Sequence, residues 1–218
     1  MATILQINNS IFGDAGKSST FADNFIIELR KLQPNLKVIR RNLASEPLPH
    51  LTADAFRAAL IARDQRTTEQ AKAASVADAV VAELLEADQL VIASPTYNFN
   101  ISSTLKAWFD HAARAGTTFR YTPNGPEGLL KHIKAYVFIS SGGYHLGTER
   151  DFQGQYVRFM LKFLGITDVE LSYLEGMTKG DEAVSKGMQA AQERLRSLAA
   201  SWIEPQGIEL PLGQTAKA

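Results

Sequence analysis

The stretch Leu90-Val91-Ile92-Ala93-Ser94-Pro95-Thr96-Tyr97-Asn98-Phe99-Asn100-Ile101-Ser102 decides the fold of this chain. Its first four residues form an apolar run that is typical of a strand buried on both faces. Pro95 has no amide N–H and ends that strand, and Ser102 is of a type that commonly caps a helix. A strand that leads through a polar, aromatic loop into a helix is the unit of an open α/β sheet. Such sheets bind ligands at the carboxyl ends of their strands.

Similar apolar runs recur along the chain and alternate with segments of helical periodicity. The expected strands are 3–8, 36–41, 89–94, 133–140 and 169–174. The expected helices are 20–32, 67–85, 103–113, 152–163 and 182–202. This alternation predicts the α/β class, with a flavodoxin-like, doubly wound sheet of five parallel strands in the order 2-1-3-4-5 and helices on both faces.

We expect one domain over residues 1–203, with two insertions and a tail. The insertion at about 42–66 contains Pro47, Pro49 and an alanine-rich stretch, which predict a loop and a short helix. The insertion at 117–130, TTFRYTPNGPEGLL, has a turn sequence flanked by aromatic residues and predicts a protruding hairpin. Residues 204–218 are rich in Pro and Gly without periodicity, so we expect a mobile tail.

The composition narrows the class of partner. The chain has 218 residues, 23 basic and 23 acidic, with no net charge, so nothing favours binding to nucleic acid or to an anionic membrane. It has no cysteine, and its four histidines lie in no carboxylate pattern, so we expect no metal site. The start of the chain does not resemble a signal peptide, and no apolar run approaches the ~20 residues of a membrane span. We therefore expect a cytoplasmic protein.

The first loop, Asn9 to Ser19, lies between the first expected strand and helix. Its residues Ser10, Gly16, Lys17 and Ser18 bring hydroxyls, backbone N–H groups and a helix N-terminus to one place, which suits a phosphate. Two other interpretations stay open. The serines could only cap the helix, and Gly16-Lys17-Ser18 matches the end of a nucleotide-triphosphate P-loop. That motif requires glycine where this chain has Ile11, and no later strand ends in an Asp for Mg²⁺.

The second and third loops follow the third and fourth expected strands. Tyr97 and Phe99 are core residue types, but they share a short loop with amides that could serve the mixed donor and acceptor edge of a flat heteroaromatic ligand. Paired glycines let the backbone approach a ligand closely, although they also occur in ordinary turns. The candidate ligand-binding residues are Pro95, Thr96, Tyr97, Asn98, Phe99, Ser140, Ser141, Gly142, Gly143 and His145. In the predicted sheet order all three loops converge at one edge.

At these residues the chain resembles the FMN-dependent NADH:quinone oxidoreductase and azoreductase family of flavodoxin-like enzymes. The similarity extends from the first strand to about residue 202. Its most specific parts are Tyr97-Asn98-Phe99-Asn100-Ile101-Ser102, Phe119-Arg120-Tyr121 with Asn124-Gly125-Pro126-Glu127-Gly128, Gly142-Gly143, and Gly165-Ile166-Thr167-Asp168.

The resemblance implies a homodimer with an FMN at each of two interface sites. Ser10 and Gly16 to Ser18 match positions that hold the FMN phosphate and ribityl chain. Thr96 to Phe99 and Ser140 to Gly143 match positions that hold the ring. Phe119, Tyr121 and Phe163 correspond to substrate-binding aromatics near the flavin face, at least one of them from the other subunit. Some relatives have arginine where this chain has Ser141.

The resemblance also implies the reaction, in which NADH or NADPH reduces the flavin and a quinone or azo compound then accepts two electrons at the same face. One shared face predicts ping-pong kinetics, and no side chain is assigned as an obligatory acid or base. Two alternatives remain: a flavodoxin-like electron carrier without substrate turnover, and a P-loop nucleotide-binding protein. Carriers of that kind are generally shorter and strongly acidic, whereas this chain is neutral.

Overall fold

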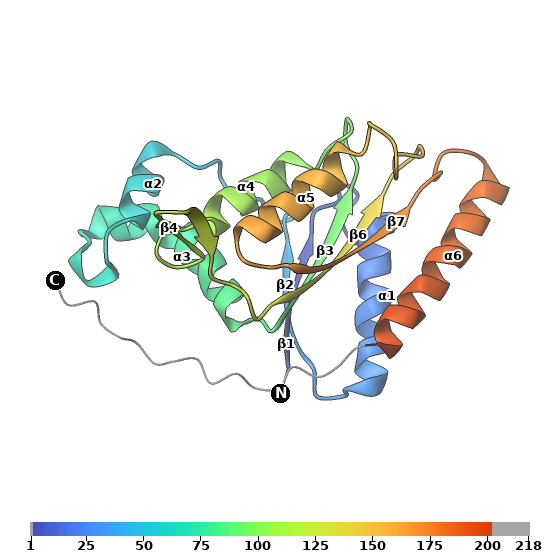
Figure 1. Cartoon of the computed structure of the whole chain (residues 1–218), viewed down its shortest axis with the longest axis horizontal. Coiled ribbons are helices and arrows are strands. Elements are labelled where there is room, and N and C mark those ends of the chain that lie inside the picture. The colour runs from blue at the N-terminus through green and yellow to red at the C-terminus, as the bar shows by residue number, and fades with distance from the viewer. Residues whose placement is uncertain (1, 202–218) are drawn as a thin grey trace.

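The computed structural model describes residues 2–201 and forms one open sheet with helices on both faces (Figure 1). Five strands make the sheet: β1 (Thr3–Asn8), β2 (Lys37–Asn42), β3 (Gln89–Pro95), β6 (Lys134–Ser140) and β7 (Asp168–Leu174). They are all parallel, in the order β2-β1-β3-β6-β7. The α/β class and the parallel, five-stranded sheet are therefore confirmed. Because β2 and β3 lie on opposite sides of β1, the chain changes direction across the sheet between β1 and β3.

The helices cover the sheet in two groups. On one face lie α1 (Lys17–Leu32) and α6 (Asp181–Ala200), and on the other lie α3 (Thr68–Glu86), α4 (Ser103–Ala112) and α5 (Phe152–Phe163). Every residue of β1 and β3 is buried, and the apolar run Leu90-Val91-Ile92-Ala93 of β3 is the sequence pattern expected of such a strand. The five expected helices are all present, although α1 begins three residues earlier than the periodicity predicted.

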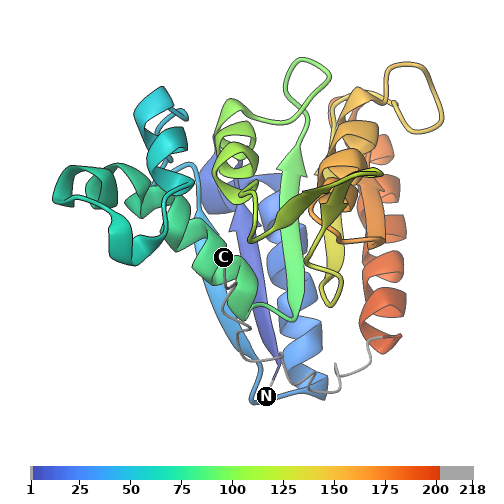
Figure 2. The ribbon, with the colours of Figure 1, turned by 60° about the vertical axis from the view of Figure 1, so that its left-hand side comes forward.

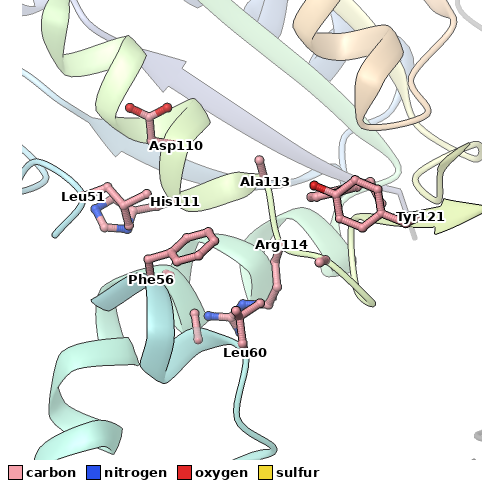
Figure 3. Close-up of a pocket in the computed structure, with 12 residues that line it drawn as sticks. Leu51, Phe56, Leu60, Asp110, His111, Ala113, Arg114 and Tyr121 are labelled. Atoms are coloured by element: carbon pink, nitrogen blue, oxygen red, sulfur yellow. The ribbon is translucent and has the colours of Figure 1, made fainter. Parts of the chain in front are cut away.

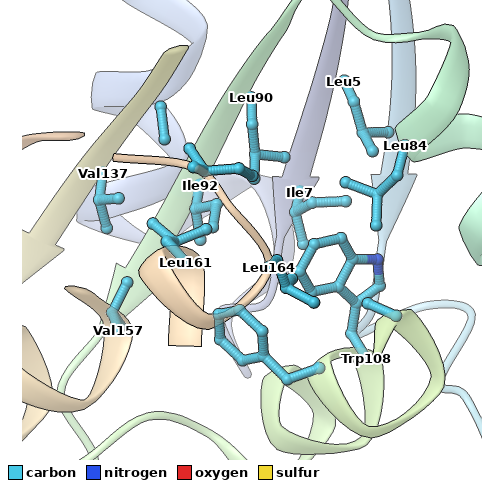
Figure 4. Close-up of a cluster of buried hydrophobic side chains, with 14 of the residues drawn as sticks. Leu5, Ile7, Leu84, Leu90, Ile92, Trp108, Val137, Val157, Leu161 and Leu164 are labelled. Carbon is cyan, nitrogen blue, oxygen red and sulfur yellow. The ribbon is translucent and has the colours of Figure 1, made fainter. Parts of the chain in front are cut away.

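The strands divide their side chains between two hydrophobic cores, because successive residues of a strand point to opposite faces. Val91 and Ala93 of β3 face α1 and α6, where Phe25 packs against the rings of Tyr136 and Phe138. The neighbouring residues of β3 face the other way and pack around Trp108 of α4 (Figure 4). Helices from both ends of the sequence are thus fixed to one sheet, which holds the loops at its carboxyl edge.

The insertions adopt the forms that the sequence predicted. The first contains α2 (Ala53–Ala59), which packs against α3, and a 3-10 turn, η2 (Arg63–Gln65). The second is an antiparallel hairpin of β4 (Phe119–Thr122) and β5 (Gly125–Gly128), which lies on the α4 and α5 side of the sheet (Figure 2). A Cβ on Gly128 would lie 2.0 Å from the backbone nitrogen of Gly165, so the hairpin is held against the end of α5 by direct backbone contact.

Two further expectations concern the ends of the chain and membranes. The expected tail, 204–218, and the end of the last expected helix lie outside the described residues. Across residues 2–201, no helix combines the length and the apolar character needed to cross a bilayer.

Candidate functional site

Three loops meet at the carboxyl edge of β1, β3 and β6, and buried polar side chains join them. Asn9, directly after β1, donates its amide N–H to the carbonyl of Ala93 in β3 and accepts a hydrogen bond from the hydroxyl of Ser102 at 2.9 Å. Ser102 also caps α4 by accepting from Leu105 N–H at 3.1 Å, as the sequence predicted. Figure 2 shows the loops after β3 and β6 rising from the same edge of the sheet. The predicted convergence is therefore present in the fold.

The first loop leads into the N-terminus of α1. Gly16 is the N-cap residue, no side chain caps the helix, and its first turn contains no acidic residue. The hydroxyls of Ser18 and Ser19 are buried and have no hydrogen-bond partner among the described residues. The interpretation that these serines only cap the helix is therefore wrong. Free helix N–H groups and unpaired hydroxyls at a positive helix end suit a phosphate.

Close packing fixes the shape of this loop. A Cβ on Gly16 would lie 2.2 Å from the hydroxyl oxygen of Ser10, so only glycine allows the two residues to approach. Ser10 is buried, and its hydroxyl accepts a hydrogen bond from Phe12 N–H at 3.2 Å. Lys17, the first residue of α1, is exposed. Ser10, Gly16, Lys17 and Ser18 are thus gathered at one helix end, as predicted.

Tyr97 joins the first loop to the second. Its hydroxyl accepts a hydrogen bond from Ile11 N–H at 2.9 Å and lies 3.4 Å from the hydroxyl of Ser10. The side chain of Tyr97 is partly buried and connects the second loop to the first. Pro95 is buried at the end of β3, and the next residue, Thr96, donates its N–H to the carbonyl of Ser140 at 2.8 Å, which ties the second loop to β6.

The second loop turns through two residues in the left-handed backbone region. Tyr97 and Asn100 exchange backbone hydrogen bonds of 2.9 and 3.1 Å, and the residues between them, Asn98 and Phe99, have φ of 49° and 67°. Two successive positive φ values are characteristic of a type I′ turn, which glycine favours and a bulky residue resists. Phe99 is 51% exposed, so the interpretation of it as a core residue is wrong. Backbone strain that presents an aromatic ring to solvent is typical of functional loops.

The third loop presents its glycines beside the second. The ring of His145 lies edge-on to Phe99, with centroids 5.6 Å apart. Gly142 contacts Thr178, whose hydroxyl donates to the Gly142 carbonyl at 3.0 Å, and the hydroxyl of Ser141 donates to the Gly143 carbonyl at 2.9 Å. The carbonyls of Gly142 and Gly143 therefore already accept hydrogen bonds from side chains of the protein. The two glycine residues are only partly covered, so their backbone is accessible at this edge of the sheet.

Several supporting residues were missed in the sequence. Gln153, buried in α5, donates to the carbonyl and the hydroxyl of Ser94, both at 2.8 Å, and accepts from the hydroxyl of Thr96. Glu175, after β7, accepts the N–H groups of His145 and Leu146. Gln153 lies inside a helix, where a single Gln carries no pattern that periodicity detects, whereas Glu175 directly follows β7. The sequence pattern that could have identified such supporting residues is a polar residue directly after a strand, as at Asn9.

The predicted substrate-binding aromatics gather elsewhere. The rings of Phe119 and Phe163 lie 4.6 Å apart, and Tyr121 stacks edge-on against Phe119 at 5.4 Å. Tyr121 is 77% exposed on the hairpin. Together with α2, α3 and α4, Phe119 and Tyr121 line a cavity to which none of the three loops contributes (Figure 3). Within one chain the structure thus groups these aromatics with each other rather than with the three loops.

A carboxylate on α3 organises the wall of that cavity. Asp78 accepts hydrogen bonds from Arg114 and, at 2.6 Å, from Arg66, while Arg63 lies 3.4 Å away. Burial of Asp78 favours its neutral form, but the hydrogen bonds from Arg66 and Arg114 and the positive charges of Arg114 and Arg63 outweigh it and lower its pKa. Asp78 is therefore ionised at neutral pH. Among the described residues, no three His, Cys, Asp or Glu side chains gather as metal ligands would.

The sheet topology defines a flavodoxin-like α/β protein, and the three convergent loops make the carboxyl edge its candidate ligand site. A family model described as "Flavodoxin-like fold" matches residues 2–199. The FMN-dependent NADH:quinone oxidoreductase 6 of Burkholderia lata is 43% identical over 195 residues, which are 89% of this chain and 98% of that protein.

Solved structures agree with this relationship. An azoreductase from Bacillus anthracis str. Sterne superposes with a TM-score of 0.84 at 28% identity, over 93% of this chain and all of that one. An FMN-dependent NADH-azoreductase from Bacillus anthracis str. Ames Ancestor, solved in complex with FMN, gives a TM-score of 0.79 at 26% identity, over 91% and 100%. The chain belongs to the flavodoxin-like family of FMN-dependent NADH:quinone oxidoreductases and azoreductases.

Proposed function

We propose that this chain is an FMN-dependent reductase that transfers two electrons from NADH to quinones and reductively cleaves aromatic azo compounds. The observation that carries the proposal is the pair of buried serine hydroxyls at the N-terminus of α1, which have no partner in the part of the chain that the structure describes. An aromatic turn and a pair of glycines follow the neighbouring strands β3 and β6. The names of the relatives support the same cofactor and donor. NADPH is the alternative donor.

The donor set fits FMN. In this proposal Ser10, Gly16, Lys17 and Ser18 hold the phosphate and the ribityl chain, because that end of the site provides hydroxyls, helix N–H groups and no carboxylate in the first helical turn. The second and third loops would hold the ring. The residues assigned to it are Pro95, Thr96, Tyr97, Asn98, Phe99, Ser140, Ser141, Gly142, Gly143 and His145.

When bound, FMN supplies the hydride and two-electron chemistry, and the protein supplies orientation and electrostatics. The amide of Asn98 and the N–H groups of Gly142 and Gly143 would donate hydrogen bonds to the ring edge. Phe99 and His145, in edge-to-face contact, form one wall of the site. No side chain is assigned as an obligatory acid or base. Donor and acceptor use one face in turn, which gives ping-pong kinetics.

The assembly that fits this proposal is a homodimer in the cytoplasm, with the flavodoxin-like domain over residues 1–203. Tyr121 is largely exposed on a hairpin remote from the three loops of its own chain. An aromatic ring in that position suits a partner subunit's site. We therefore assign Phe119, Tyr121 and Phe163 to the substrate pocket across the interface.

An absorption spectrum of the purified protein tests the proposal. We expect flavin bands after FMN is supplied, loss of those bands when NADH is added under anaerobic conditions, and their return when a benzoquinone follows. Absence of flavin binding would refute the proposal. Bound flavin with negligible NADH oxidation would identify an electron carrier instead. Parallel lines in double-reciprocal plots are expected, and intersecting lines would refute the shared face.

A further inference from the structure

A buried glutamine on α5 holds the start of the second loop. Gln153 is 2% exposed, and its side-chain nitrogen donates to the carbonyl and to the hydroxyl of Ser94, both at 2.8 Å. Its side-chain oxygen accepts a hydrogen bond from the hydroxyl of Thr96. One amide therefore connects α5 to the residues on both sides of Pro95, where β3 ends and the loop begins.

The backbone of β3 decides the orientation of this amide. A carbonyl oxygen can only accept a hydrogen bond, so the atom of Gln153 that faces the Ser94 carbonyl has to be the nitrogen. The Pro95 carbonyl, 3.4 Å from the same nitrogen, requires the same orientation. The amide oxygen then faces Thr96, whose hydroxyl has to donate its single hydrogen to it. Toward any other group the Thr96 hydroxyl can only act as an acceptor.

The start of α5 is itself fixed, which keeps Gln153 in this place. Asp151 caps the helix by accepting from Gly154 N–H at 3.0 Å, and the hydroxyl of Tyr173 donates to its other oxygen at 2.7 Å. Burial of Tyr173 and its hydrogen bond to Asp151 raise the pKa of the phenol, so it remains a donor at neutral pH. A Cβ on Gly154 would lie 1.9 Å from the Tyr173 hydroxyl, so glycine is what allows α5 and β7 to approach this closely.

We propose that Gln153 is a positioning residue that keeps the Thr96 hydroxyl an acceptor toward the flavin ring and thereby favours reduced over oxidised FMN. The inference rests on the proposed function, in which the partly exposed Thr96 is one of the residues that hold the ring. Reduced flavin carries an additional N–H group on its central ring, where oxidised flavin has a nitrogen lone pair. A hydroxyl that can only accept stabilises the reduced form and repels the oxidised one. Hydrogen bonds to ring nitrogens are one way in which a protein tunes a flavin.

The reduction potential of FMN bound to the full-length protein tests this role. Gln153→Met keeps the length of the side chain but releases the hydrogen of the Thr96 hydroxyl, which can then donate to oxidised flavin. The affinity for oxidised FMN relative to reduced FMN should rise about fivefold, the effect of one neutral hydrogen bond, and lower the two-electron potential by about 20 mV. A merely structural role would weaken the binding of both forms equally. An unchanged or raised potential would therefore overturn the proposal.

A matched control and a second variant keep the test decisive. Gln155→Met is the control, because Gln155 is on the same helix but exposed, and it should leave the potential unchanged. An equal shift in both variants would overturn the proposal. If Gln153→Met fails to fold, Thr96→Val removes the acceptor itself and keeps the shape of the side chain. Its potential should also fall, and an unchanged potential would refute the role of Thr96.

The double variant shows whether the two residues act together. In a protein that already carries Thr96→Val, Gln153→Met should have no further effect on the potential. Additive shifts would show that Gln153 acts without Thr96 and would overturn the proposal. Failure of the protein to bind FMN would refute the proposed function as well, whereas bound FMN whose potential does not respond to these variants would refute this inference alone.

Discussion

Substitution of Ser18 with alanine should change folding stability and FMN binding in opposite directions. The Ser18 hydroxyl is buried in the first turn of α1 and has no described partner. A structural hydroxyl would stabilise the protein without ligand. A hydroxyl that has no hydrogen-bond partner until a phosphate binds destabilises the ligand-free protein and stabilises only the complex.

The magnitudes follow from the cost of an unpaired polar group. Leaving a buried hydroxyl without a partner costs about 1–3 kcal/mol, so its removal should raise the free energy of unfolding of the FMN-free protein by about 0.5–1 kcal/mol after the loss of its contacts. A hydrogen bond to a charged group contributes about 1.5–3 kcal/mol. Ser18→Ala should therefore weaken FMN binding about 10- to 150-fold. Ser19→Ala should show the same pair of signs.

Two assays on the same preparation measure these effects. Urea unfolding of the FMN-free protein gives the change in stability, and the quenching of flavin fluorescence on titration gives the affinity. Ser75→Ala is the control, because that hydroxyl lies exposed on α3 and already donates to the carbonyl of Lys72 at 2.8 Å. It should alter neither quantity by more than about 0.5 kcal/mol. A Ser18→Ala protein that is less stable but binds FMN normally would refute the reasoning.

Three further predictions concern other parts of the fold. Asp78→Asn should lower the free energy of unfolding at pH 7 by about 3 kcal/mol, because Arg66 and Arg114 are buried and lose their counter-charge. The folded-state pKa of Asp78 is lowered, so its contribution is present above the unfolded pKa of about 3.9 and is lost as the pH falls. Urea unfolding should therefore show the stabilities of the wild-type and Asp78→Asn proteins converging below about pH 4, and a difference that stays constant with pH would contradict this. The Phe99→Gly protein should be more stable than the Phe99→Ala protein by about 1 kcal/mol, because residue 99 has φ of 67°, which glycine adopts more easily than alanine. Glycine variants are ordinarily the less stable ones. Thermal unfolding of the two variants tests this, and a more stable Phe99→Ala protein would show that the turn is unstrained. Gly128→Ala should lower the free energy of unfolding by at least about 3 kcal/mol, because its Cβ would lie 2.0 Å from the backbone nitrogen of Gly165. An unchanged melting temperature would show that the hairpin and the end of α5 are not in backbone contact.

Much of the fold could be predicted from the sequence, because buried parallel strands leave unmistakable apolar runs. The expected strand at 3–8 and the expected helix at 152–163 agree with β1 and α5 at both ends. The start of α1 was placed too late, since Lys17, Ser18 and Ser19 are polar and lack periodicity although two of them are buried. Their burial depends on packing at the sheet edge, which local sequence does not encode.

Part of the candidate site could be predicted because the apolar strands, and therefore their carboxyl ends, are recognisable in the sequence. Residues that directly follow strands, such as Tyr97 and Gly142, must lie at the carboxyl edge once the strands are parallel. Glu175 directly follows β7 and fits this rule, but Gln153 lies inside α5 and could not be found in this way. Gln153 reaches Ser94 from a helix, and that contact depends on how α5 packs on the sheet.

The sequence by itself determined the class of fold, the position of the three loops and the family, because periodicity and short motifs are properties of neighbouring residues. The tertiary structure decided what the side chains do. It shows that the hydroxyls of Ser18 and Ser19 have no hydrogen-bond partner within residues 2–201, that Phe99 is exposed in a turn with positive φ, and that Arg66 and Arg114 both donate to Asp78. Each of these facts depends on contacts between residues distant in the chain, which form only when the sheet brings them together.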